Sequence, residues 1–287
     1  MDGASKLVAT FFRNNRSMRE KVWLFLRGSS LLRKLYAIRI FATPMRIVSY
    51  LLVPSTGQKR MRVLAGPAKG LLLDVNPRWE HDAWDGSYEL PALESFRGLL
   101  ASDTIVYDVG AGVGFYALVA ARARASVIAF EPDPENAEAF AANIDLNRVT
   151  AQIRLVRQAV FSHTGHVTLR ISKSIQTHRN TSAFVGKVDG GTICKVVCTT
   201  LDDFIVDNPV PNLLKIDVEG AESSVLQGAD HLFRRFRPRL LCEIHDDSNA
   251  LFVSEWLNER GYNCRWIEEK ELFPRHLLAL PKEKHMI

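Results

Sequence analysis

The segment Tyr107-Asp-Val-Gly-Ala-Gly-Val-Gly-Phe115 decides the fold of this 287-residue chain. It joins a short apolar run, residues 104–109, to an Ala-rich stretch with helical character, residues 115–124. A glycine-rich turn between a buried strand and a helix lets a ligand approach the backbone at the carboxyl edge of a sheet. The segment therefore predicts an α/β fold with a ligand loop at residues 110–114.

The alternation of strand and helix continues through the rest of the chain. Short apolar runs predict strands, and longer stretches of helical character predict helices. Strands that alternate with helices predict a Rossmann-like fold, with a mainly parallel, seven-stranded sheet covered by helices on both faces. The predicted strands are 104–109, 126–131, 153–160, 167–172, 194–199, 213–218, 239–245, 264–268 and 277–280, with helices at 90–100, 115–124, 134–147, 220–236 and 248–260, a hairpin at 61–75 and a polar loop at 177–191.

The charge of the chain is concentrated at its start. The net charge is +5, but residues 1–62 hold 13 Lys and Arg against two acidic residues, so the remainder carries −6. We therefore predict a basic helical extension at 1–60 and a second domain at 61–287. Three roles are open for the extension: packing on the body or on a second subunit, peripheral contact with an anionic membrane, or nucleic-acid binding. The last is disfavoured because no RNA-binding module is visible.

Cysteine usage and hydropathy predict a cytoplasmic protein, and peripheral membrane contact through the extension stays one of the alternatives. The four cysteines form no CxxC pair, which is typical of reduced, buried thiols. Charged residues interrupt every apolar run near the start of the chain, so we predict neither a signal peptide nor a transmembrane segment.

Acidic residues flank the predicted ligand loop. Asp108 lies two residues before Gly110, which is followed by Ala111 and Gly112, and Phe115 stands where a dinucleotide fold has its third glycine. A carboxylate at that point repels a pyrophosphate but suits an ammonium group such as that of a methionine moiety. The acids that follow the second strand complete the predicted cofactor set, with Glu131 placed for ribose hydroxyls and Asp133 for the adenine side.

Several motifs in order resemble those of the FkbM-type methyltransferases. They are Tyr107-Asp-Val-Gly-Ala-Gly-Val-Gly-Phe-Tyr-Ala-Leu118, Phe130-Glu-Pro-Asp-Pro-Glu-Asn136, Thr199-Thr-Leu-Asp202 and Leu214-Lys-Ile-Asp-Val-Glu-Gly-Ala-Glu222, preceded by Trp84-Asp-Gly-Ser-Tyr-Glu89. The resemblance covers about residues 66–245 and leaves out the basic extension. It implies an enzyme that uses S-adenosyl-L-methionine, commonly to methylate hydroxyls of sugars, polyketides or other small metabolites.

A second group of chemically active residues follows two later strands. Asp217 and Glu219 alternate on one face at the end of strand 213–218, and Glu243 and His245 do so at the end of strand 239–245. We interpret Asp217, Glu219 and His245 as catalytic candidates, one of which takes the proton of an attacking hydroxyl. Alternatively, Glu219 caps the next helix and Lys215 forms an internal salt bridge with Asp217.

A divalent cation such as Mg²⁺ is a further alternative for the same edge. Asp217, Glu243 and His245 would be its ligands, and the ion would polarise the substrate oxygen. Three residues are candidates for substrate contact: Trp84 and Tyr88, which could cover the pocket or pack on the sheet, and Asn180 in the polar loop.

These patterns together predict a methyltransferase that O-methylates a hydroxyl of a sugar, a glycolipid or another small metabolite. Two other functions remain open. One is an RNA or protein methyltransferase whose basic extension holds the polymer, and the other is a binding module that keeps the fold without activity. The acceptor itself cannot be read from the sequence, because substrate loops vary freely on this fold.

Overall fold

The computed structural model describes residues 57–77, 79–173, 180–184, 192–269 and 271–283 of the chain. These residues belong to two compact units that divide between Leu90 and Pro91. The division lies beyond the predicted boundary at residue 60. The basic extension falls almost entirely outside the described residues, so its predicted helices and contacts stay predictions.

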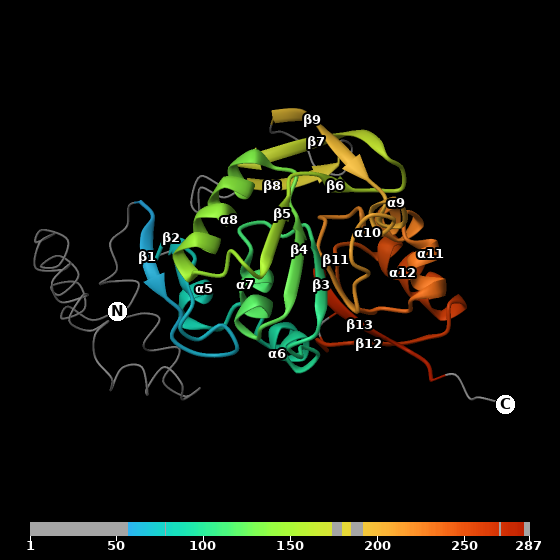
Figure 1. Cartoon of the computed structure of the whole chain (residues 1–287), viewed down its shortest axis with the longest axis horizontal. Coiled ribbons are helices and arrows are strands. Elements are labelled where there is room, and N and C mark those ends of the chain that lie inside the picture. The colour runs from blue at the N-terminus through green and yellow to red at the C-terminus, as the bar shows by residue number, and fades with distance from the viewer. Residues whose placement is uncertain (1–56, 78, 174–179, 185–191, 270, 284–287) are drawn as a thin grey trace, which may run out of the picture. The chain divides into compact units, whose positions relative to one another are not determined.

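The second unit is built on a seven-stranded sheet with the order β12-β13-β11-β10-β3-β4-β5. The five strands from β11 to β5 are parallel, whereas β13, near one edge, is antiparallel to both of its neighbours, β11 and β12 (Figure 1). The predicted, mainly parallel sheet is therefore confirmed. Its strands are β3 (Ile105–Val109), β4 (Ser126–Phe130), β5 (Ile153–Val156), β10 (Leu213–Ile216), β11 (Arg239–Ile244), β12 (Tyr262–Trp266) and β13 (Arg275–Pro281).

The strand order reverses next to β3. The chain builds β4 and β5 on one side of β3 and then crosses over to build β10 and β11 on the other side. Ligands of doubly wound sheets bind at such a reversal, outside the carboxyl ends of the strands. The residues that follow β3, β10 and β11 are therefore the first place to look for a site.

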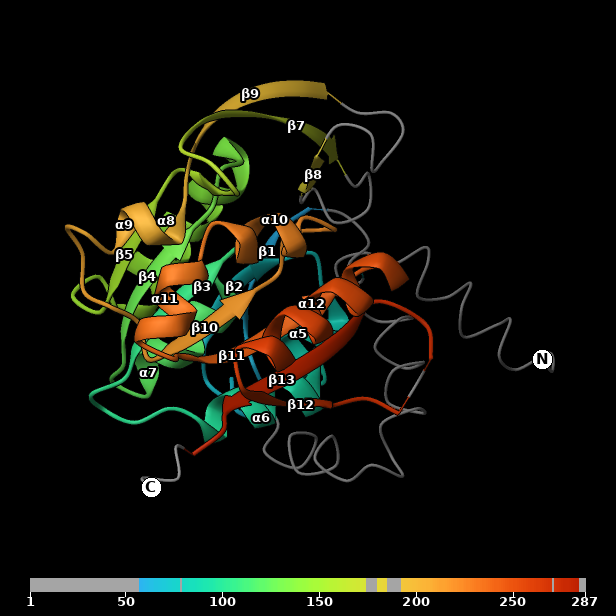
Figure 2. The same cartoon turned by 90° about the vertical axis from the view of Figure 1, so that its right-hand side faces the viewer.

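Helices cover both faces of this sheet (Figure 2). The helices of the second unit are α6 (Leu90–Gly98), α7 (Phe115–Arg122), α8 (Pro134–Asn147), α9 (Leu201–Phe204), α10 (Glu222–Gln227), α11 (Asp230–Arg235) and α12 (Asp247–Glu259). Residues of α9 to α12 share one buried cluster with the sheet. On the other face, α7 packs against β3 and β4.

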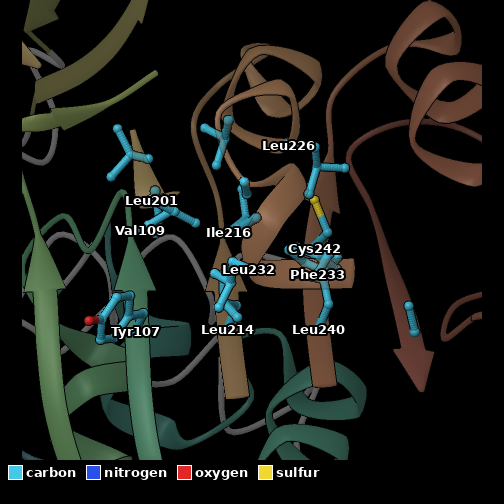
Figure 3. Packing of buried hydrophobic residues seen from close by; sticks show 14 of the residues in the cluster. Tyr107, Val109, Leu201, Leu214, Ile216, Leu226, Leu232, Phe233, Leu240 and Cys242 are labelled. Carbon is cyan, nitrogen blue, oxygen red and sulfur yellow. The ribbon is translucent and has the colours of Figure 1, made fainter. Parts of the chain in front are cut away.

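Side chains alternate along β3 and β10, so that one face of these strands is apolar and the other carries charged residues. Tyr107, Val109, Leu214 and Ile216 lie in the hydrophobic cluster on the side of α9–α12 (Figure 3). Burial of such side chains contributes about 1.5–3 kcal/mol each, so this face holds the strands firmly. The residues between them, including Lys215, point to the opposite face, toward α7.

Three predicted segments differ from the structure. The predicted strand 153–160 is divided, because only residues 153–156 belong to the central sheet and residues 159–160 belong to a second one. The predicted helix 220–236 is two helices, α10 and α11, with Gly228 between them; a Cβ on Gly228 would lie 2.3 Å from the carbonyl oxygen of Phe161, so only glycine fits there. The predicted loop 177–191 contains β8 (Asn180–Phe184), which pairs with β7 (Gly165–Lys173). With β6 (Ala159–Val160) and β9 (Thr192–Thr199), these strands form a second sheet of order β6-β9-β7-β8.

The described part of the first unit is small. β1 (Lys59–Arg62) and β2 (Leu72–Val75) pair antiparallel, as the hairpin pattern predicted, and α5 (His81–Asp85) follows them. Among the described residues of the whole chain, no helix combines the length and the apolar character that crossing a bilayer requires.

Candidate active site

The glycine-rich loop after β3 is tied to the end of β4. The N–H groups of Gly110 and Ala111 both donate to the carbonyl oxygen of Phe130, at 3.0 and 2.9 Å. The N–H of Gly112 donates to Oε2 of Glu131 at 2.7 Å. The loop and the acid that the sequence analysis grouped together are thus joined by hydrogen bonds.

Two glycines of the loop are needed for different reasons. Gly110 has φ +78°, and a Cβ there would lie 1.7 Å from the carbonyl oxygen of Asp217. Gly112 has φ +56°, and a Cβ there would meet no atom within 4 Å. The first glycine therefore lets β10 approach the loop, whereas the second leaves an open side where a ligand can come close to the backbone.

This difference predicts unequal costs of adding a methyl group. Gly110→Ala forces the loop and β10 apart, so we expect it to lower the free energy of unfolding by more than about 3 kcal/mol. Gly112→Ala meets only the cost of a left-handed residue, about 1–2 kcal/mol. Urea unfolding of both variants measures the difference, and equal losses would contradict the assigned geometry.

Two acidic side chains are buried beside the loop. Burial raises the pKa of Asp108 to about 6, although the Lys215 ammonium and the N–H of Ala117 act against this shift. Burial likewise raises the pKa of Glu131 to about 8, against hydrogen bonds from the N–H groups of Asp133 and Gly112. Oδ2 of Asp108 is buried and has no hydrogen-bond partner among the described residues. Such desolvated carboxyls favour a ligand that brings positive charge or hydrogen-bond donors.

Lys215 is a buried ammonium between the loop and the next strand ends. Its side chain is 1% exposed, and Nζ lies 3.4 Å from Oδ2 of Asp217 and 3.8 Å from Oε2 of Glu243. Nζ also lies 4.8 Å from the centre of the Tyr116 ring of α7. The predicted ion pair with Asp217 is confirmed, and the same ammonium compensates two carboxylates at once.

His245 lies among three carboxylates. Its Nδ1 is 2.7 Å from Oε1 of the buried Glu222, and its Nε2 is 3.7 Å from Asp217 and 3.5 Å from Glu219. Burial lowers the pKa of His245, but the hydrogen bond to Glu222 and the charges of Asp217, Glu222 and Glu219 outweigh it and raise the pKa to about 9. The structure thus brings the three predicted catalytic residues together.

Glu243 connects Lys215 with charged residues near the edge of the sheet. Its Oε2 lies 3.4 Å from Nε2 of His276 on β13, whose Nδ1 lies 2.6 Å from Oε1 of Glu268. Burial raises the pKa of Glu243, yet the hydrogen bond from His276 and the Lys215 charge hold it well below its usual range. From Glu268 to Glu222, acidic and basic side chains therefore alternate along the carboxyl ends of β11 and β10 and the amino end of the antiparallel β13.

Glu219 does not cap the helix that follows it. The residue before α10 makes no side-chain capping bond, and the N–H of Gly220 donates instead to Oε1 of Glu222 at 2.9 Å. Glu219 has φ +50°, a left-handed conformation that costs a non-glycine residue about 1–2 kcal/mol. Its half-buried carboxylate faces Nε2 of His245, and burial raises its pKa. The helix-cap alternative is therefore wrong, and the strained backbone aims Glu219 at the imidazole.

The remaining predicted contacts are placed differently. Asp133 is fully buried and caps α8, where its Oδ1 accepts from the N–H groups of Glu135 and Asn136. Trp84 is buried in the first unit and donates to the carbonyl oxygen of Pro77 at 2.9 Å. Both side chains thus have partners within the protein, and the predicted contacts of Asp133 with the cofactor and of Trp84 with substrate stay predictions. Tyr88 lies in the same unit and Asn180 begins β8, but the side chain of Asn180 falls outside the description, so their substrate contacts stay predictions.

Sequence reasoning assigned no role to Glu222, His276 or Glu268. Glu222 ends the quoted motif Leu214–Glu222, and its place at the start of α10, three residues after Glu219, is a local signal for it. His276 and Glu268 lie near the antiparallel edge of the sheet. No local sequence pattern indicates that His276 contacts both Glu243 and Glu268.

Comparison with known proteins shows which family the chain belongs to. The family model described as the methyltransferase FkbM domain matches residues 108–264. Hexuronic acid methyltransferase AglP of Haloferax volcanii is 26% identical over 160 residues, which cover 55% of this chain and 62% of that protein. Methyltransferase 1 of Beauveria bassiana is 29% identical over 176 residues, 55% of this chain and 71% of that protein. The alignment thus spans less than two thirds of the length of AglP.

Solved structures include a methyltransferase FkbM from Methylobacillus flagellatus KT, which is 19% identical and aligns with a TM-score of 0.46 over 63% of this chain and 45% of that chain. The family match begins at Asp108, spans more than half of the chain, and contains the glycine-rich loop and the acidic ends of both later strands. The chain therefore belongs to the methyltransferase FkbM domain family.

Proposed function

We propose that the protein is a methyltransferase that uses S-adenosyl-L-methionine and transfers its methyl group to a hydroxyl of a sugar, a glycolipid or another small metabolite. One observation carries the proposal: a buried, unsatisfied carboxylate beside an open glycine loop lies on the same face of the sheet as an imidazole that is set between carboxylates. The first feature suits a cationic cofactor, and the second suits removal of a hydroxyl proton.

Three residues of the loop region would hold the cofactor. Oδ2 of Asp108 is free to accept from an ammonium group, and Glu131 directly follows β4, where ribose hydroxyls would lie. Gly112 leaves its open side to the ligand. When bound, S-adenosylmethionine supplies a methyl group on a positively charged sulfur atom. The acidic surroundings of the loop stabilise that charge, whereas they would repel a pyrophosphate.

The residues after β10 and β11 would prepare the acceptor. Neutral His245 takes the hydroxyl proton at Nε2 while the oxygen attacks the methyl group in line with the leaving sulfur. Asp217 and Glu219, whose side chains are 25% and 42% exposed, can accept hydrogen bonds from further hydroxyls of the same molecule. This arrangement supports a polyhydroxylated acceptor, and the similarity to a hexuronic acid methyltransferase supports a sugar.

A divalent cation does not fit this arrangement. Asp217, Glu243 and His245 do offer ligand atoms within 4.8 Å of one another. However, the buried Lys215 ammonium already lies beside both carboxylates, and it would repel a second cation. We propose that Lys215 supplies the positive charge that Mg²⁺ supplies in metal-dependent sites.

Activity in the presence of a chelator tests the metal-free proposal. We expect the rate in excess EDTA to stay within about twofold of the rate in excess Mg²⁺, because Lys215 is a permanent part of the chain. A loss of tenfold or more that Mg²⁺ restores would contradict it.

Product analysis with a panel of acceptors tests the proposed function. Purified protein and labelled S-adenosylmethionine are incubated with glucuronic acid, glucose, a phenolic glycoside and total RNA, and release of S-adenosylhomocysteine is followed. We expect turnover with a sugar and an alkali-stable methyl ether as product. An alkali-labile ester would show transfer to a carboxylate, turnover with RNA alone would favour the polymer alternative, and no turnover of any acceptor would favour a binding module.

A further inference from the structure

Glu222 is a completely buried acid that lies behind the proposed base. Its side chain is 0% exposed, yet it begins the short helix α10 at the edge of the site. Oε1 accepts from the N–H of Gly220 at 2.9 Å and lies 2.7 Å from Nδ1 of His245. Oε2 has no hydrogen-bond partner among the described residues. Since a desolvated carboxylate is costly, the imidazole is the group that compensates this one.

The contact determines which ring nitrogen of His245 exchanges its proton. An ionised carboxylate only accepts hydrogen bonds, so Nδ1 carries the proton that points to Glu222. Nε2 is then the atom that gains or loses a proton, and it faces Asp217 and Glu219 at 3.7 and 3.5 Å. Without Glu222, either tautomer and either ring orientation would be available to the imidazole.

We propose that Glu222 is a positioning residue for methyl transfer: it holds His245 in the tautomer and orientation that present Nε2 to the acceptor hydroxyl. The proposal rests on the proposed function, because it assigns the proton of the acceptor to His245. Glu222 touches neither substrate nor methyl group in this role and acts through the imidazole alone. When His245 becomes an imidazolium during the reaction, the Glu222 carboxylate stabilises its positive charge.

The competing explanation is that Glu222 only fixes the loop through the N–H of Gly220. Glu222→Gln separates the two explanations, because its amide oxygen can still accept from the N–H of Gly220 and from Nδ1–H of His245 but lacks the negative charge that stabilises an imidazolium. If Glu222 only fixes the loop, this variant would lose little activity, whereas if Glu222 acts through the charge of His245, the variant would lose much. Glu255→Gln is the matched control, since Glu255 is exposed on α12. Urea unfolding of each variant confirms that it is folded under the assay conditions.

A double-mutant cycle with His245→Gln tests the proposal by activity, with the acceptor that gives the highest rate in the panel. Glu222→Gln is expected to lower kcat by at least about tenfold, with KM for S-adenosylmethionine changed less than about twofold. In the His245→Gln background the same substitution is expected to change kcat by less than about twofold, because the two residues act as one unit. An equal effect in both backgrounds, or kcat at the wild-type level for Glu222→Gln, would overturn the proposal.

A second readout needs no acceptor. The Nδ1 proton of His245, shared with a buried carboxylate, is expected as a downfield proton resonance that is missing from His245→Gln and shifted upfield in Glu222→Gln. If the resonance is unchanged in Glu222→Gln, the positioning role is wrong even if the enzyme methylates sugars. If wild-type protein transfers no methyl group while the resonance behaves as expected, the proposed function fails instead.

Discussion

His245→Gln is expected to lower kcat by about 10²- to 10⁴-fold, the range that a general base contributes. Glutamine occupies a similar volume but cannot take a proton from the acceptor hydroxyl. KM for S-adenosylmethionine is expected to change little, since the cofactor contacts lie at the ends of β3 and β4. His166→Gln is the control, because His166 is exposed on β7. A rate within about threefold of wild type would remove His245 from the chemistry.

If His245 is the general base, the activity of the wild-type enzyme should depend on pH. The carboxylates around His245 raise its pKa to about 9, so only a small fraction of the imidazole is neutral at pH 7. We expect kcat/KM to rise about tenfold per pH unit from pH 6 and to level off near pH 9. This rise should be absent in His245→Gln, where the remaining activity no longer depends on the imidazole.

The same shift has the opposite effect on stability. The folded-state pKa of His245 lies above its ordinary value of 6.5, so its contribution is fully present below pH 6.5 and is lost as pH rises through about 9. We expect the wild-type protein to become less stable over the range in which it becomes more active. Unfolding free energies at pH 6 and pH 9.5, compared between wild type and His245→Gln, measure this contribution.

Lys215→Met is expected to lower the free energy of unfolding by about 3–5 kcal/mol at pH 8, the cost of breaking a buried ion pair on one side. Methionine fills the space of the aliphatic stem, but Asp217 and Glu243 lose the ammonium that lies 3.4 and 3.8 Å away. Asp108 loses the charge that partly offsets its burial. Catalysis should fall as well, because Asp217 is no longer held beside His245.

The loss of stability in Lys215→Met should depend on pH. Removing the ammonium raises the folded-state pKa values of the carboxyls around it, so their repulsion is present above those values and disappears as they take up protons. We therefore expect a smaller loss at pH 5 than at pH 8. Lys195→Met is the control, because Lys195 is exposed on β9. A loss below about 1 kcal/mol at pH 8 would show that the carboxyls do not need Lys215.

The parts of the fold that depend on local pattern could be predicted from the sequence. β3, β4, β10 and β11 could be predicted from their apolar runs alone, because a strand that is buried on both faces is apolar along its length. The same holds for the loop, where glycine is required by the close approach of Asp217 to Gly110. These elements fixed the edge at which Asp217, Glu219 and His245 meet.

Features that depend on distant partners could not be predicted. β8 has a polar sequence and becomes a strand because the backbone of β7 pairs with it. The predicted helix 220–236 is interrupted at Gly228, whose carbonyl oxygen accepts from the N–H of Asp202, and the Asp202 carboxylate accepts from the first turn of α11. The partners of His245 and Glu243 at Glu222 and His276 come from other elements, and no spacing in the sequence places them together.

Calorimetric titration is the direct test of whether the glycine-rich loop binds S-adenosylmethionine. We expect saturable binding to the wild-type protein at one site per chain. We expect the affinity to fall at least about tenfold in Asp108→Asn, because this substitution neutralises the carboxylate that faces the cationic cofactor. NAD serves as the comparison ligand and should not bind. The proposed cofactor would be contradicted if the folded wild-type protein gave no heat with S-adenosylmethionine. The proposed role of Asp108 would be contradicted if Asp108→Asn bound the cofactor as tightly as wild type.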